Sequence, residues 1–204
     1  KHIGKLFKKL NTKKIIQFGS LRSNYFKIHK SKKIDLLFIS CWANLDLSHR
    51  IDDNFSSKDF FDKQADLLTN LSKYSKKYNL NLHILGKRNE HKLEYNFYKN
   101  IFKNKIKWKF LKAGKHNPYK IIDSSKIVFN LYSTLGYESF SRGNKTIFFN
   151  PYKKSIKSLT FGWPCKNFKN EGPFWTEKMD YNNIEKIINS VKLMNKNKFV
   201  NFRK

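Results

Sequence analysis

The stretch that decides the fold is Ile34–Cys41, which reads IDLLFISC. A continuous apolar run of this length is typical of a parallel strand that is buried on both faces. Similar short runs occur at Leu80–Leu85, Ile106–Leu111, Ile127–Tyr132 and Lys145–Asn150. Their recurrence along the chain predicts a sheet of buried strands.

Segments with helical periodicity separate these runs. After the polar loop Asn44–Ser57, an amphipathic segment begins at Phe60 and ends at Asn79, with a Ser as its expected N-cap. Further helices are expected at Glu90–Phe102, Asn117–Ile122, Ser133–Arg142 (closed by Gly143) and Tyr181–Met194 (capped by Asp180). Strands that alternate with helices form parallel units with right-handed crossovers. The sequence therefore predicts an α/β fold, a doubly wound, Rossmann-like, mostly parallel sheet of about five to six strands.

We expect three parts along the 204-residue chain. Residues 1–33, with a brief strand at Lys14–Phe18, are expected to be the tail of a preceding domain or a linker. Residues 34–178 are expected to form the Rossmann-like domain, and residues 179–204 a C-terminal helix with a basic tail. Since the sequence does not begin with Met, we expect it to be part of a longer protein.

The net charge of +28 raises the question of a polyanionic partner. Only five of the 43 basic residues are Arg, whereas recognition of bases and phosphates favours Arg. The Lys are spread over every segment together with many Asn, Ile and Phe, whose codons are rich in A and T, so a biased genome explains most of the charge. We therefore do not expect nucleic acid as a partner. Anionic ligands and a peripheral contact with an anionic membrane surface remain compatible with this charge.

Cofactor and metal motifs are missing from the sequence. Cys41 and Cys165 have no metal-ligand spacing, and both are expected to be buried or idle thiols. No HExxH, Walker or GxGxxG motif is present, so neither a metal nor a nicotinamide or flavin cofactor is predicted. No apolar run approaches the roughly 20 residues of a membrane-spanning helix, and no signal peptide is visible. A cytoplasmic protein, peripheral to the membrane at most, is expected.

The strongest candidate for a binding site is Ser133–Glu138 (STLGYE), which follows a predicted strand and opens a helix. Free N–H groups and partial positive charge at a helix N-terminus attract phosphate. Ser133 and Thr134 add hydroxyl groups, Gly136 allows a close approach, and Glu138 is placed to accept hydrogen bonds from a ribose. The equally weighted alternative is a simple capping role for Ser133 and Glu138.

Three basic residues lie in loops between the predicted elements. Lys87 and Arg88 follow the strand Leu80–Leu85 and are candidates to neutralise a diphosphate. His116 is a candidate contact to a base or phosphate. The alternative to a binding role is a solvated surface position. This alternative is at least as well supported as binding for Lys87 and better supported for His116. It is less well supported for Arg88, because Arg is scarce in this sequence.

The aromatic stretch Phe161–Trp175 is expected to be irregular. Long loops inside a compact domain usually either function or cover something. Trp163 and Trp175 are candidates for a rim that stacks on a base or sugar, and the alternative is a lid over the edge of the core.

The segment around these motifs resembles the C-terminal half of GT-B glycosyltransferases. Within them it is most similar to the group that builds bacterial capsule, lipopolysaccharide and related surface glycans. Three patterns carry the resemblance: D-x-S-x-x-V at Asp123–Val128, S-T-x-G-x-E at Ser133–Glu138 and G-x-K-x-x-F-F at Gly143–Phe149. Gly19–Asn24 and the aromatic stretch are similar to that group as well.

This resemblance implies glycosyl transfer from a nucleotide-sugar donor in surface polysaccharide biosynthesis. It implies Ser133, Thr134 and Gly136 at the donor phosphate and Glu138 near the ribose. GT-B enzymes need no bound metal, because protein cations and helix dipoles stabilise the leaving phosphate. Lys87 and Arg88 are candidates for that role here.

The acceptor site and the general base usually lie in the N-terminal domain of such enzymes. The resemblance therefore implies a glycan or lipid-linked acceptor but identifies no catalytic residue in this chain. We expect the chain alone to bind donor without turning it over.

Other readings of the sequence stay open. A basic nucleic-acid-binding module would need a cationic face and exposed aromatic residues on its strands. A related nucleotide-sugar epimerase or phosphotransferase would need suitably placed carboxylates, and no persuasive pair is present. An α/β domain with an inactive remnant of a site is the fourth possibility.

Overall fold

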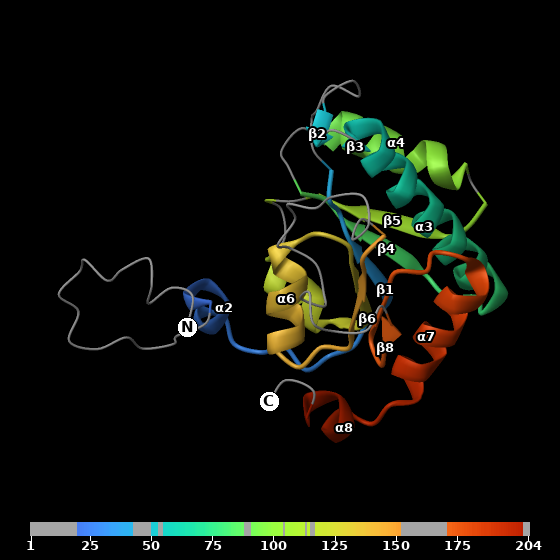
Figure 1. Cartoon of the computed structure of the whole chain (residues 1–204). Helices are drawn as coiled ribbons and strands as arrows, with labels where there is room; N and C mark the ends of the chain where they lie inside the picture. The colour runs from blue at the N-terminus through green and yellow to red at the C-terminus, as the bar shows by residue number, and fades with distance from the viewer. Residues whose placement is uncertain are drawn as a thin grey trace, which may run out of the picture.

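The computed structural model describes residues 20–42, 50–52, 55–87, 91–103, 105–112, 114, 117–151 and 171–201. Its centre is one seven-stranded sheet in the order β5-β4-β1-β6-β7-β9-β8 (Figure 1). The strands are β1 (Ile34–Ile39), β4 (Leu82–Leu85), β5 (Trp108–Leu111), β6 (Ser125–Asn130), β7 (Thr146–Phe149), β8 (Glu171–Gly172) and β9 (Trp175–Thr176). All neighbours pair in parallel except β8, which lies antiparallel to β9 at the edge. The predicted α/β fold with a mostly parallel sheet is confirmed.

The order of the strands reverses once. From β1 the chain moves outward to β4 and β5, then returns to β6 on the other side of β1 and continues to β7. Leu36 in the middle of β1 thus pairs with Leu82 on one side and with Ile127 on the other. Such a reversal creates a topological switch point, here between the carboxyl ends of β1 and β6.

Helices cover both faces of the sheet. On one face lie α3 (Ser57–Lys77), α4 (His91–Phe102) and α7 (Tyr181–Leu193), and on the other α5 (Pro118–Asp123) and α6 (Thr134–Ser141). Figure 1 shows α3 and α7 on the side of the sheet opposite α6. Two short helices, α2 (Leu21–Tyr25) and α8 (Lys196–Asn201), precede and follow this body.

Alternate side chains of β1 explain why both faces need cover. Leu36 and Phe38 are buried in the cluster that includes α3, whereas Leu37 and Ile39 are buried with Tyr119 of α5. A strand that is apolar on both faces is stable only inside such a sandwich. Burial on both faces explains why the run IDLLFI is almost entirely apolar.

Local end signals of the helices are confirmed. Ser56 caps α3 in a capping box with Asp59, and Asp180 caps α7 through the Asn183 N–H. Asn79 and Gly143, the expected helix ends, adopt positive φ angles of 48° and 86°. Both lie in the left-handed region that ends a helix.

Six elements were not expected. The polar loop Asn44–Ser57 contains a small hairpin, β2 (Arg50–Asp52) and β3 (Phe55–Ser56), and the aromatic stretch contains β8 and β9. These strands are two or three residues long, too short to show a periodicity. The helices α2 and α8 lie in the parts expected to be tails. The expected strand Lys14–Phe18 falls outside the described residues, and the domain limits at 33 and 178 stay a prediction. None of the helices in the described ranges is long and apolar enough to cross a membrane.

Candidate functional site

The switch point brings together the residues that follow β1 and β6. The buried Cys41 thiol lies against the backbone N–H groups of Leu131 and Tyr132, so the two loops are in direct contact. Burial raises the pKa of Cys41 to about 11, against the opposing effect of these N–H groups and of the positive charge of Lys87. At neutral pH this thiol is protonated and enclosed, as the sequence predicted, and it serves as packing.

The N-terminus of α6 opens at this point. Ser133 occupies the N-cap position with extended φ and ψ of −115° and 134°, yet its side chain makes no capping hydrogen bond. Its backbone N–H donates to Oδ1 of Asn130 at 3.1 Å. Within the described ranges, the N–H groups of Thr134 and Leu135 have no backbone acceptor. The Ser133 hydroxyl and these N–H donors therefore remain available to a ligand.

Gly136 is required by a contact inside the protein. A Cβ atom at this position would lie 2.1 Å from Cγ of Asn130, which is itself fully buried at the end of β6. The lack of a side chain thus lets the first turn of α6 pack directly on the Asn130 amide. Nδ2 of Asn130 has no hydrogen-bond partner in the part of the chain described. The approach of a phosphate to Gly136 stays a prediction.

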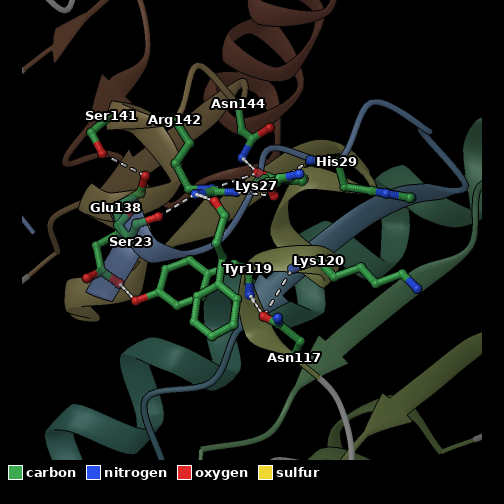
Figure 2. Close-up of polar contacts among 12 residues, drawn as sticks. Ser23, Lys27, His29, Asn117, Tyr119, Lys120, Glu138, Ser141, Arg142 and Asn144 are labelled. Atoms are coloured by element: carbon green, nitrogen blue, oxygen red, sulfur yellow. Dashed lines mark hydrogen bonds and ion pairs between the residues drawn. The ribbon is translucent and has the colours of Figure 1, made fainter. Parts of the chain in front are cut away.

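Glu138 points away from the start of its own helix. One carboxylate oxygen accepts a hydrogen bond from the Ser20 hydroxyl. The other accepts one from the Tyr119 hydroxyl at 3.0 Å (Figure 2). Ser20 is also the N-cap of α2, where it accepts the Ser23 N–H at 3.1 Å. Glu138 therefore ties α6 to α2 and α5, and it does not cap α6. Each of its oxygens still has a lone pair for a further donor.

Lys87 is positioned through its backbone. Its N–H donates to the Glu94 carboxylate at 2.9 Å, and that carboxylate is fully buried. Oε1 of Glu94 also accepts from the Ser40 hydroxyl at 2.5 Å, and Ser40 accepts from the Tyr98 hydroxyl at 2.6 Å. This network fixes the loop after β4 to the loop after β1, while the Lys87 side chain stays exposed.

A second network, which sequence reasoning did not interpret, anchors the far end of α6. Arg142 donates to both carboxylate oxygens of the buried Asp123, at 3.0 and 2.5 Å. Its remaining donors reach the carbonyl groups of Ser23, Phe26 and Lys27 at 2.7 to 3.2 Å, so all five guanidinium N–H groups are used (Figure 2). Burial would raise the pKa of Asp123, but hydrogen bonds from Arg142, Asn144 and the His29 N–H outweigh it and hold that pKa below its usual value. The motifs around Asp123 and Arg142 are thus structural.

The other candidate residues are not at the switch point or cannot be placed. Arg88, His116 and Trp163 lie outside the described residues. Trp175 lies on β9, with β6 and β7 between it and β1, and its indole covers Gly172 and contacts the Phe174 ring edge-on at 4.9 Å. This packing is that of a cover on the sheet edge, and stacking on a base or sugar stays a prediction. Among the residues described, no group of three or more His, Cys, Asp or Glu is arranged to hold a metal.

Comparisons with known proteins identify the family to which this chain belongs and one solved structure that it resembles. The chain resembles the solved structure of TarM with 17% sequence identity and a TM-score of 0.41, over 87% of this chain and 32% of that one. It thus spans about a third of the length of TarM, and a likeness of this degree decides nothing about function. A search of curated proteins finds no match. Residues 1–203 match the family described as "putative O-antigen biosynthesis protein". The chain belongs to this O-antigen biosynthesis family.

Proposed function

We propose that this chain supplies the nucleotide-sugar-binding part of a metal-independent glycosyltransferase in surface polysaccharide biosynthesis. The observation that carries the proposal is the open N-terminus of α6 at the switch point, with a Ser133 hydroxyl that its own helix does not use. Ligands of open α/β sheets bind at this position. Family membership supports the biosynthetic context.

In the proposed complex the donor diphosphate lies against the first turn of α6. Thr134 and Leu135 offer backbone N–H groups and Ser133 its hydroxyl, all directed at negative charge. As the acceptor hydroxyl forms its bond to the anomeric carbon and gives its proton to a base, the bond between the sugar and the diphosphate breaks and its electron pair stays on the phosphate oxygen. Lys87 would stabilise the charge that develops there, together with the helix dipole.

Glu138 would receive a ribose hydroxyl as a third donor beside Ser20 and Tyr119. Its present partners hold the carboxylate at one orientation, so a ribose would meet a preorganised acceptor. The acceptor sugar or lipid and the general base are assigned to no residue of this chain.

The nucleic-acid alternative receives less support from the described part of the structure. It required aromatic residues on exposed strands, whereas Phe38, Phe129, Phe148 and Phe149 of the central strands are buried. Stacking of bases on a strand surface needs accessible rings.

The test is a thermal-shift panel with CMP, CDP, UDP, GDP and a short single-stranded DNA, each at low and moderate salt. We expect one nucleotide to raise Tm at both salt concentrations. Ser133→Ala should remove this shift and leave the Tm without nucleotide almost unchanged, because the Ser133 side chain caps nothing. Ser141→Ala, at the opposite end of the same helix, is the matched control and should keep the shift.

A second pair of variants tests the cation. Lys87→Gln should weaken the nucleotide shift, and Lys99→Gln, an exposed Lys on α4, should not. Stabilisation by DNA that disappears with salt, with no preferred nucleotide, would refute the proposal. An equal loss in Ser133→Ala and Ser141→Ala would also refute it.

A further inference from the structure

A cavity of about 640 Å³ lies at the amino edge of the sheet, opposite the switch point. Its walls come from the segment before β1, the start of β6, the turn between α6 and β7, and the end of α7. The volume is in the range of pockets that bind small ligands. The nucleotide proposal uses none of its residues.

The floor of the cavity is apolar. Leu36, Leu80 and Ile127 line it together with the ring of Tyr74. The Tyr74 hydroxyl already donates a hydrogen bond to Oδ1 of Asn189 at 2.8 Å, so we assign it no contact with a ligand. Ile28 also lines the cavity, and its side chain is 58% exposed. Leu36 and Ile127 are almost fully buried, so the half-buried Leu80 and the exposed Ile28 offer the apolar surface on which an aliphatic chain would lie.

The rim of the cavity is cationic. Five Lys line it (Lys30, Lys32, Lys126, Lys145 and Lys192), and the lining contains one acidic residue, Asp35. Asp35 is already bonded to Lys126 at 2.7 Å. The rim therefore has a large excess of positive charge around an apolar floor.

Lys145 is a partly buried cation of this rim with no negatively charged partner among the described residues. Its ammonium donates to the Lys192 carbonyl at 2.8 Å, and among the described residues it forms no ion pair. Partial burial lowers its pKa, since the charged form is deprived of water without a compensating negative charge. A phosphate at this position would restore the missing interaction.

We propose that this cavity binds a phosphate-bearing amphiphile, with its aliphatic chain on the floor and its phosphate at Lys145. Residues 1–19 of the chain do not fit this role, because they contain several Lys and no acidic residue. A nucleotide does not fit it either, since the floor offers aliphatic side chains and no accessible aromatic face. The proposal is independent of the proposed function, and either one can fail without the other.

The test uses dodecyl phosphate below its critical micelle concentration, measured by titration calorimetry at moderate salt. An uncharged dodecyl ether and inorganic phosphate are the comparison ligands. We expect dodecyl phosphate to bind at least about tenfold more tightly than either, the value of one charge-assisted hydrogen bond or of a few buried methylenes. Equal affinity for the uncharged ether, or for inorganic phosphate, would overturn the proposal.

Two matched pairs of variants locate the site. Lys145→Gln and Ile28→Ser should each weaken dodecyl phosphate binding several-fold. Lys99→Gln and Leu93→Ser replace a Lys and an exposed Leu on α4, far along the chain from the cavity, and should leave binding unchanged. Equal weakening by test and control variants would mean unspecific attraction to a polycation and would overturn the proposal.

Co-sedimentation with phosphatidylcholine vesicles that contain phosphatidic acid separates two sources of the ligand. Vesicle binding that Lys145→Gln and Ile28→Ser reduce would identify a membrane lipid as the source. Binding of dodecyl phosphate without binding of vesicles would identify a free amphiphile. Binding of neither would refute the proposal.

Discussion

Replacing Asp123 by Asn should cost far more stability than the same change at Asp35. Asp123 is fully buried and accepts four hydrogen bonds: two from Arg142, one from Asn144 at 2.9 Å and one from the His29 N–H at 2.9 Å. Asp35 forms a surface pair with Lys126 at 2.7 Å, in which the Lys side chain is 59% exposed. The Asp35 side chain is 20% exposed, so the two substitutions make the same chemical change in a partly exposed and in a fully buried environment.

The expected size of the loss follows from the donors around Asp123. An Asn retains one acceptor oxygen, while its NH₂ group faces two donors that previously met the second oxygen. Arg142 is then buried with no neutralising charge and keeps its three carbonyl partners and at most one bond to the remaining Asn oxygen. Disruption of a buried pair of this kind costs about 3–5 kcal/mol. Asp35→Asn should cost less than about 1 kcal/mol, as surface pairs do.

The loss at Asp123 should depend on pH. Because the pKa of Asp123 is lower in the folded than in the unfolded protein, its contribution to stability is complete above the unfolded pKa of about 3.9. The contribution disappears as the pH falls through the folded pKa. The difference in the free energy of unfolding between wild type and Asp123→Asn should therefore be constant near pH 7 and become smaller below about pH 4.

Urea unfolding followed by circular dichroism, at pH 7 and at steps down to pH 3, measures these differences. A difference at pH 7 below about 1 kcal/mol for Asp123→Asn, or equal to that of Asp35→Asn, would refute the assignment of a buried anchor. A difference that stays constant into acid would refute the role of the carboxylate charge. If Asp123→Asn is unfolded at pH 7, Arg142→Lys tests the forked geometry of the anchor instead, because it keeps the positive charge and loses the paired hydrogen bonds to Asp123, and it should still cost more stability than Asp35→Asn.

Three further predictions concern α6, the cap of α5 and the loop after β1. Gly136→Ala should destabilise the fold by about 1–3 kcal/mol in urea unfolding, because the new methyl group overlaps Asn130, and adding Asn130→Ser should recover part of the loss. A loss unaffected by Asn130→Ser would contradict this contact. Asn117→Ala should cost about 1 kcal/mol, since Asn117 caps α5 by accepting the Tyr119 N–H at 2.9 Å; an unchanged urea midpoint would contradict the cap. In a Cys165→Ser background, Cys41 should react with a thiol reagent only after unfolding, because its thiol is 4% exposed and its pKa is raised to about 11; rapid labelling of the native protein would contradict its burial.

The parts of the fold that the sequence predicts are those with local signals. A continuous apolar run such as Ile34–Ile39 can only be buried on both faces, and Gly143 and Asp180 mark helix ends by their own conformational preferences. Each of these signals is contained within a few neighbouring residues. The order of the elements and the class of the sheet follow from them.

The parts that the sequence does not predict depend on contacts between distant residues. Glu138 meets Ser20 across 118 positions, and Arg142 meets the carbonyl of Ser23 across 119. Neither pair leaves a pattern in one sequence, so the position of its helix and the family resemblance predict a ribose contact for Glu138 but give no sign of its contact with Ser20. The contact of Asn130 with Gly136 is equally invisible in the sequence, because a single polar residue inside the predicted strand Ile127–Tyr132 does not show that the strand ends there with its amide buried against a helix.

The two proposed sites lie at opposite ends of one short helix. The N-terminus of α6 opens at the switch point, whereas Arg142, Asn144 and Lys145 after its C-terminus line the cavity at the amino edge. Eight residues span only about 12 Å, so a movement of α6 would change both sites.

Coupling between two sites requires a structural element that can adopt two arrangements. Arg142, which anchors α6, uses all five of its N–H donors in the present arrangement and has none left to stabilise another. We therefore expect the two ligands to bind independently: a saturating concentration of dodecyl phosphate should change the Kd for the preferred nucleotide by less than about twofold, well under the fivefold or more of typical allosteric coupling. Calorimetric titration of nucleotide with and without the amphiphile measures this ratio. A change of tenfold or more would mean that α6 moves despite its anchor, and the rigidity argued for Arg142 and Asp123 would be wrong.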